Sequence, residues 1–132
     1  RQIILENLNN FSKQFNFNKA LKLTNLWINI NGYKDSNETH THPSSFFSGV
    51  FYVKTPENSG NLSFVHPSCE FCSWVFEKNI TNHITNNSAY WSFQPKENEL
   101  YIFPSFYKHK VTPNMNKDEK RISISFNSYL LI

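Results

Sequence analysis

Apolar residues near the start of the chain recur with the period of an α-helix. Over residues 1–20, Ile4, Leu8, Phe11 and Phe15 are four, three and four positions apart, and this spacing places them on one side of a helix. The opposite side is polar. An amphipathic helix of this kind buries one side against a sheet, so we expect it to have a structural role.

The pattern changes at Leu21, where apolar and polar residues begin to alternate with the period of a β-strand. Further short runs rich in β-branched and aromatic residues follow, separated by turn-forming residues. The predicted strands are 21–31, 46–54, 62–65, 74–76, 89–93, 100–103, 108–112 and 121–131. Many short strands with one N-terminal helix favour two packed antiparallel sheets, most simply a jelly roll.

The segments between the predicted strands contain turn signals. Residues 56–60 combine proline, asparagine and glycine and predict a hairpin turn that pairs the strand 46–54 with the strand 62–65. Residues 33–39 are polar and predict a loop.

Two asparagines, Asn29 and Asn31, interrupt the apolar pattern of the first predicted strand. A polar residue at such a position is either exposed to solvent or directed at a ligand. The pattern alone favours exposure.

Length and composition indicate a single β-rich domain. The chain has 132 residues, enough for one domain with a core and too few for two ordinary ones. Aromatic residues make up 17% of it, with 13 Phe and only one Met, which favours sheet over helix. We therefore expect one domain over residues 1–132, with the helix at about 1–20 and the β-barrel core at about 21–131.

Charge and hydropathy narrow the classes of partner. The formal net charge is +3 without a long basic run, so nucleic acid is not indicated, whereas a small anionic ligand would fit. No apolar stretch reaches the roughly twenty residues of a membrane span, and no secretory signal is recognisable. We expect a soluble, cytoplasmic protein that does not bind a membrane.

The two cysteines, Cys69 and Cys72, form a Cys-x-x-Cys motif flanked by His66 and His83. A zinc site built from these residues would need a loop to fold around the ion without a second cysteine pair. Two ordinary thiols in a hairpin are therefore the favoured interpretation.

A candidate metal site begins with His40 and His42, which come shortly before the predicted strand 46–54. In an extended chain, side chains two residues apart point the same way, so the two imidazoles can bind one metal ion. An isolated His-x-His motif is more often a solvated loop. A third histidine, His109, enters a later predicted strand and can complete a site.

Arg121 follows His109 by twelve residues and begins an otherwise apolar strand. Arg121 and Ser123 share one face of that strand, and a guanidinium beside a hydroxyl can bind a carboxylate. Taken singly, each residue could be exposed to solvent: His109 because it lies between two lysines, and Arg121 because it begins a strand. The joint occurrence of these residues favours a functional site.

The combination resembles the iron(II) and 2-oxoglutarate-dependent oxygenases, and most closely an uncharacterised group of 2OG-Fe(II) oxygenases. The resemblance implies that the jelly roll is the mainly β, double-stranded β-helix fold of these enzymes. The similarity spans about residues 21–130. The motifs that carry it are Trp27-Ile28-Asn29, His40-Thr41-His42, Ser48-Gly49-Val50-Phe51-Tyr52-Val53, Phe103-Pro104-Ser105, His109, and the run Arg121-Ile122-Ser123-Ile124-Ser125-Phe126-Asn127.

The resemblance implies Fe(II) bound by His40, His42 and His109. It also implies 2-oxoglutarate bound to the metal, with its far carboxylate on Arg121 and Ser123. With dioxygen, such enzymes produce succinate, carbon dioxide and a hydroxylated second substrate, and the metal centre supplies the difficult chemical step.

Two further cosubstrate contacts are suggested by the resemblance. Asn29 lies in the predicted strand adjacent to the histidine pair, and Tyr52 lies in the strand that follows it. Both are candidates for contact with 2-oxoglutarate.

The chain departs from the common pattern of these oxygenases at one metal ligand. Most use His-x-Asp or His-x-Glu with a distal histidine, whereas His42 occupies the position of the carboxylate. Asp35 or Glu38 could supply a carboxylate if the preceding loop turned inward, although neither has the usual spacing. Three neutral ligands would leave more positive charge on the iron.

Two alternatives from other classes remain open. A cupin-type enzyme can use three histidines without 2-oxoglutarate, but the usual cupin glutamate after His-x-His is absent, and Arg121 and Ser123 would have no role in it. The other alternative is a non-catalytic jelly-roll binding module. No motif identifies the second substrate, whose pocket we expect the segments 33–39 and 66–88 to shape.

Overall fold

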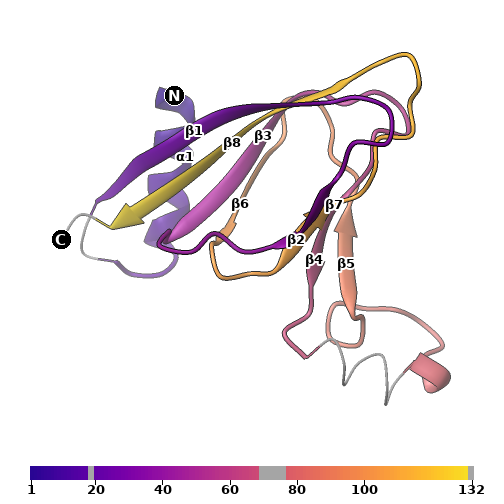
Figure 1. The fold of residues 1–132 in the computed structure, drawn as a ribbon. Helices are drawn as coiled ribbons and strands as arrows, with labels where there is room; N and C mark the ends of the chain where they lie inside the picture. The colour runs from indigo at the N-terminus through magenta and orange to yellow at the C-terminus, as the bar shows by residue number, and fades with distance from the viewer. Residues whose placement is uncertain (18–19, 69–76, 131–132) are drawn as a thin grey trace.

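The computed structural model describes residues 1–17, 20–68, 77–130. The described residues form one α-helix, one short 3-10 helix and two four-stranded sheets in which all pairs are antiparallel (Figure 1). The first sheet has the strand order β1-β8-β3-β6 and the second β2-β7-β4-β5. This arrangement confirms the predicted jelly roll with an N-terminal helix. The bounds are α1 (Gln2–Lys13), β1 (Leu21–Asn31), β2 (Asn37–His40), β3 (Phe47–Lys54), β4 (Leu62–Val65), a short 3-10 helix η2 (Glu77–Asn79), β5 (Tyr90–Phe93), β6 (Leu100–Pro104), β7 (His109–Val111) and β8 (Arg121–Leu130).

The helix α1 packs on the outer face of the first sheet, as its amphipathic pattern predicts. Ile4 and Leu8 are buried in a cluster with Leu23 of β1, Phe47 of β3 and Phe126 of β8. Burial of each such side chain contributes about 1.5–3 kcal/mol, so this layer fixes the helix and the first sheet together.

The helix ends at Lys13, earlier than the predicted end near residue 20. Asn16 adopts a left-handed backbone conformation with φ 54°, which a helix does not tolerate. Phe15 still contacts Phe11 and Phe47, with ring centroids 5.3 and 5.1 Å apart respectively. The apolar spacing therefore indicates a continuous apolar surface that extends beyond the end of the helix.

An irregularity in β1 reverses the expected orientation of its asparagines. The register with β8 shifts between Leu23 and Leu26, and one extra residue in a strand moves all later side chains to the other face. As a result Ile28 and Ile30 are 63% and 59% exposed, while Asn29 lines the interior of the barrel, as does Asn31. The prediction that the asparagines face solvent is wrong for this reason.

The hairpin predicted at residues 56–60 is also wrong. β3 pairs with β6 and β8, whereas β4 pairs with β5 and β7 in the other sheet. Residues 56–60 therefore carry the chain from one sheet to the other. Turn-forming residues indicate that the chain changes direction, but they do not specify which sheet the next strand joins.

The segment predicted as a polar loop contains strand β2 (Asn37–His40), which pairs with β7. β2 lies at the edge of its sheet. An edge strand can be polar because it is stabilised by backbone hydrogen bonds on one side only and need not be buried.

The predicted strand 74–76 and the two cysteines, Cys69 and Cys72, lie outside the described residues. Of the histidines beside them, His66 accepts a hydrogen bond at Nδ1 from the Ser68 amide, 3.0 Å, and His83 is exposed. Within the described ranges, no helix has the length and hydropathy of a membrane-spanning segment.

Candidate active site

Three histidine side chains converge between the two sheets. His40 ends β2 and His109 begins β7, and the two are direct partners in the antiparallel register. His42 follows two residues after His40, and its ring stacks on that of His109 with centroids 5.0 Å apart. One ligand atom of each histidine lies within 4.8 Å of those of the other two. The three imidazoles are therefore close enough to share one metal ion.

Hydrogen bonds to the backbone determine which ring nitrogen can bind a metal. His40 Nδ1 lies 2.6 Å from the carbonyl oxygen of Glu38, and His109 Nδ1 lies 2.9 Å from that of Tyr107. A carbonyl oxygen can only accept, so in both rings Nδ1 carries the proton and Nε2 presents its lone pair. Backbone contacts of this kind orient histidine ligands in metal sites.

The Nε2 atoms of His42 and His109 are 3.2 Å apart. Two nitrogen ligands at about 2.1 Å from one ion lie about 3 Å apart when they meet at a right angle. The observed separation fits a pair of adjacent ligands of one ion.

Burial keeps two of the imidazoles uncharged. It lowers the pKa of His109 to about 4, an effect that the Tyr107 carbonyl opposes and the neighbouring histidines reinforce. Burial also lowers the pKa of His42, and the charge of His40 adds to this effect. Near neutral pH these two rings are in the neutral form that binds metals.

Neither nearby carboxylate joins the histidines. Asp35 Oδ2 instead accepts a hydrogen bond from the Gly32 amide, 2.7 Å, and it is the backbone carbonyl of Glu38 that contacts His40. Among the described residues, the only group of three potential ligands that could hold a metal consists of His40, His42 and His109.

A cavity extends between the sheets from the histidines to Arg121. All seven site residues that the sequence motifs indicate line it. Those on the first sheet do so because the odd-numbered positions of β8, the even-numbered positions of β3 and the odd-numbered positions of β1 beyond its register shift face inward. Asn37, Ser125 and Trp27 line it as well. The sequence patterns indicate no role for these three, although Ser125 continues the alternation of Arg121 and Ser123.

Arg121 is a buried cation with incomplete hydrogen bonding. It is 1% exposed. Its Nη1 donates to the carbonyl oxygen of Ser59 and to that of Thr112, the latter at 3.3 Å. Its Nη2 is buried and has no hydrogen-bond partner among the described residues. A buried guanidinium donor without a partner costs free energy, so this side chain suits an anionic ligand.

The charges around Arg121 are compatible with such a ligand. Burial lowers the pKa of Arg121, while electrostatic interactions with Tyr52 and Asp35 act in the opposite direction. Within the described part of the chain, the one ion pair joins Lys54 and Glu119, 2.8 Å apart and near the surface. No carboxylate of the described residues thus forms an ion pair with Arg121.

Gly60 makes the approach of Arg121 to the backbone possible. Its φ is 88°, a conformation that residues with a Cβ rarely adopt. A Cβ built at this position would overlap the carbonyl oxygen of Thr112 and lie 2.9 Å from Arg121 Nη1. Only glycine allows the crossing segment to pass this closely.

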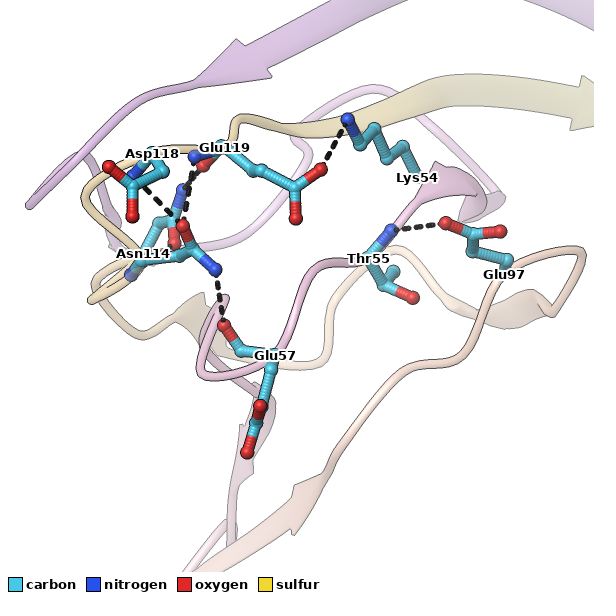
Figure 2. A network of polar contacts seen from close by, with 8 residues as sticks. Lys54, Thr55, Glu57, Glu97, Asn114, Asp118 and Glu119 are labelled. Atoms are coloured by element: carbon cyan, nitrogen blue, oxygen red, sulfur yellow. Dashed lines mark hydrogen bonds and ion pairs between the residues drawn. The ribbon is translucent and has the colours of Figure 1, made fainter.

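A polar network joins the loops that precede β8, and Figure 2 shows the part of it around Asn114, Glu57 and Glu119. Asn114 is fully buried, and its Nδ2 donates to the carbonyl oxygens of Asn31 and Glu119, both at 3.0 Å. Asn116 in turn donates from Nδ2 to the carbonyl oxygen of Glu57, 3.1 Å. These contacts tie the end of β1 to the crossing segment and to the start of β8, and so hold the backbone around Arg121.

The two other candidate cosubstrate contacts also face the cavity. Asn29 donates from Nδ2 to Ser125 Oγ, 2.8 Å. Tyr52 is 1% exposed, and burial raises its pKa to about 12 although the charge of Arg121 opposes this. The phenol therefore keeps its proton near neutral pH and can donate a hydrogen bond.

Comparison with known proteins identifies the family. The family described as "Putative 2OG-Fe(II) oxygenase" matches residues 25–127. The chain belongs to this family of 2OG-Fe(II) oxygenases. No curated protein matches the sequence significantly.

Solved structures share the fold of this chain at low sequence identity. An oxidoreductase of the 2OG-Fe(II) oxygenase family from Burkholderia pseudomallei has a TM-score of 0.65 and 14% identity, covering 89% of this chain and 49% of its own. A prolyl-4-hydroxylase from Pseudomonas putida has a TM-score of 0.56 and 12% identity, covering 89% and 57%. The non-heme alpha ketoglutarate dependent epimerase SnoN, from nogalamycin biosynthesis, has a TM-score of 0.58 and 15% identity, covering 82% and 47%. The chain thus spans about half the length of these proteins.

Proposed function

We propose that the chain is an Fe(II)- and 2-oxoglutarate-dependent dioxygenase that hydroxylates a C–H bond of a second substrate. When bound, Fe(II) and 2-oxoglutarate would supply the oxidative step. In that step 2-oxoglutarate loses carbon dioxide, one oxygen atom of dioxygen enters the resulting succinate, and the other enters the substrate. Family membership supports an oxygenase, and the residues of the cavity support this particular pair of cofactors.

The metal would be held by His40, His42 and His109. Imidazole nitrogens suit Fe(II), although they also suit other transition metals. Two of the three rings present Nε2 with Nδ1 protonated, so the donor atoms are ready without a change of tautomer. His42 would serve where a carboxylate is usual, which gives the metal three neutral protein ligands.

The far carboxylate of 2-oxoglutarate would bind Arg121. This is the observation on which the proposal chiefly rests: a metal-binding histidine group and a buried guanidinium with an unpaired Nη2 line the same cavity. Ser123 shares the inward face of β8 with Arg121, so its hydroxyl can serve as a second donor. Tyr52 and Asn29 would add hydrogen bonds from the neighbouring strands.

A cupin-type metalloenzyme without 2-oxoglutarate accounts for the histidines but gives Arg121 no ligand. The distinction can be made by binding two related acids to the metal-loaded protein. Pyruvate carries the 2-oxo acid group that binds a metal, but it lacks the far carboxylate of 2-oxoglutarate.

The test is calorimetric titration of 2-oxoglutarate and of pyruvate into the Mn(II)-loaded chain without oxygen. We expect 2-oxoglutarate to bind much more tightly than pyruvate. With Fe(II) and oxygen, slow formation of succinate from 2-oxoglutarate alone should follow. Equal affinities, or no succinate above a metal-free control, would contradict the proposal and favour the cupin alternative.

A further inference from the structure

Three polar residues of the sequence motifs have no role in the proposed binding of metal or cosubstrate, and they contact one another. Ser48 Oγ donates to Asn127 Oδ1 at 2.8 Å, and the hydroxyl oxygens of Ser48 and Ser105 are 2.7 Å apart. Ser48 has one hydroxyl proton, which it gives to Asn127, so Ser105 must donate to Ser48. Both serines are 1% exposed. We call this the Ser105–Ser48–Asn127 chain.

The chain of hydrogen bonds joins three separate segments. Ser48 belongs to β3 and Asn127 to β8, where they are direct partners in the register. Ser105 follows the end of β6. The side chains therefore attach the connection after β6 to two strands of the first sheet.

The backbone of Ser105 holds the segment that begins with His42. The Ser105 carbonyl oxygen accepts from the His42 amide at 3.0 Å, and the Ser105 amide donates to the Phe46 carbonyl oxygen at 3.1 Å. Phe46 in turn donates from its amide to the Ser128 carbonyl oxygen at 2.6 Å. Both ends of the segment 42–46 are thus fixed at Ser105.

The turn around Ser105 also leads to His109. The Tyr107 amide donates to the Pro104 carbonyl oxygen at 3.0 Å, which closes the turn. The Tyr107 carbonyl oxygen then accepts from His109 Nδ1. One short connection thus fixes the backbone of His42 on one side and the ring of His109 on the other.

We propose that the Ser105–Ser48–Asn127 chain positions His42 and His109 for metal binding. This inference rests on the proposed metal centre. The three residues are positioning residues, since they act through the connection that holds the two histidines. Loss of a hydroxyl would leave a buried hydrogen-bonding partner unsatisfied, and the connection would shift to relieve it. Because a metal needs its ligands placed within a few tenths of an ångström, a small shift would weaken binding.

The test measures Co(II) affinity and the visible spectrum of bound Co(II) in Ser105→Ala, Ser48→Ala and the double variant. The matched control is Ser63→Ala. Ser63 is also 1% exposed and also shares a hydrogen bond with a serine, Ser92, at 2.6 Å. That bond joins β4 to β5 and involves neither the connection after β6 nor the segment 42–46. Unfolding by urea is measured for each protein, so that an effect on stability is recorded separately.

Ser105→Ala and Ser48→Ala should each weaken Co(II) by about tenfold to a hundredfold, as removal of a group that orients a ligand commonly does, and alter the spectrum. The Co(II) affinity of the double variant should be close to that of whichever single variant binds Co(II) less tightly, because both changes remove the same hydrogen bond. Ser63→Ala should lose similar stability yet bind Co(II) like the parent.

Parent-like affinity and spectrum in Ser105→Ala would overturn the inference, as would equal weakening by Ser63→Ala. If Ser105→Ala does not fold, Asn127→Ala decides in its place, since it removes the half-buried acceptor at the other end of the chain of hydrogen bonds. Parent-like Co(II) binding by that variant would likewise overturn the inference. A parent protein that binds no Co(II) would instead contradict the proposed function.

Discussion

His40 and His109 face each other as direct partners across the β2–β7 pair, with ring centroids 4.3 Å apart. Each ring is fixed through Nδ1 by a carbonyl oxygen two residues before it in the chain. The same local geometry thus occurs on two adjacent strands, and it gives both imidazoles the same tautomer.

The first prediction is that His109→Ala abolishes tight metal binding and that His40→Ala weakens it strongly. Each change removes one of three nitrogen donors, and no other described residue can replace it in the group. Calorimetric titration with Mn(II) or Co(II) measures the effect. His83→Ala is the control, because His83 is exposed and does not line the cavity. Unchanged affinity and stoichiometry in both cavity variants would place the metal elsewhere.

The second prediction concerns His42, which stands where a carboxylate is usual. His42→Asp should still bind the metal, because a carboxylate oxygen is also a suitable ligand for Fe(II). His42→Ala should bind poorly, because only two imidazoles remain. The comparison requires all three proteins at the same pH. An Ala variant that binds like the parent would show that His42 is not a ligand.

The third prediction is that Arg121→Ala weakens 2-oxoglutarate while metal binding is nearly unchanged. Removing one member of a desolvated charge pair costs about 2–5 kcal/mol, or roughly a 30-fold to several thousand-fold loss in affinity. Arg121→Lys should recover only part of it, since an ammonium cannot reproduce the two-pronged geometry of a guanidinium.

Lys54→Ala is the matched control for Arg121→Ala. Lys54 is also a cation, but it is half-exposed and paired with Glu119, and it does not line the cavity. The affinity of pyruvate should be similar in the parent and in Arg121→Ala, because pyruvate has no far carboxylate. A variant that loses both acids equally would indicate general damage to the site, and one that binds 2-oxoglutarate like the parent would remove Arg121 from it.

The fourth prediction is that Gly60→Ala lowers both stability and 2-oxoglutarate affinity. The left-handed conformation and the overlap with the Thr112 carbonyl oxygen should cost about 1–3 kcal/mol of unfolding free energy. The displaced backbone would no longer hold Arg121 Nη1. Gly32→Ala is the control, since a Cβ there would lie 3.5 Å from Asp35 and make only an ordinary contact. Equal effects of the two changes, measured by urea unfolding and calorimetry, would contradict the assigned role of Gly60.

Much of the fold could be predicted from the sequence because local patterns determine it. Alternation predicted β1, β4 and β8 to within a residue, and the motif residues that share a strand face do line one cavity. The strand β2 could not be predicted in this way, since its residues are polar and it is a strand only because β7 lies beside it. Which sheet β4 joins likewise depends on contacts between distant segments.

The parts of the site that sequence patterns missed are those defined by three-dimensional contacts. Ser48 and Ser105 were recognised as motif residues, but nothing in their spacing indicates a mutual hydrogen bond across two strands. Asn37 lies in a segment with no periodic pattern, so its place in the cavity follows only from the pairing of β2.

The irregular register between Leu23 and Leu26 limits which sequence changes β1 can accept during evolution. Beyond it, Asn29 faces the cavity and Ile28 and Ile30 face solvent. Loss of a single residue at this point would exchange these positions, so that isoleucines would line the cavity and asparagine would face solvent. Substitutions along β1 can therefore accumulate one at a time, whereas its length before Asn29 is constrained by the chemistry inside the barrel.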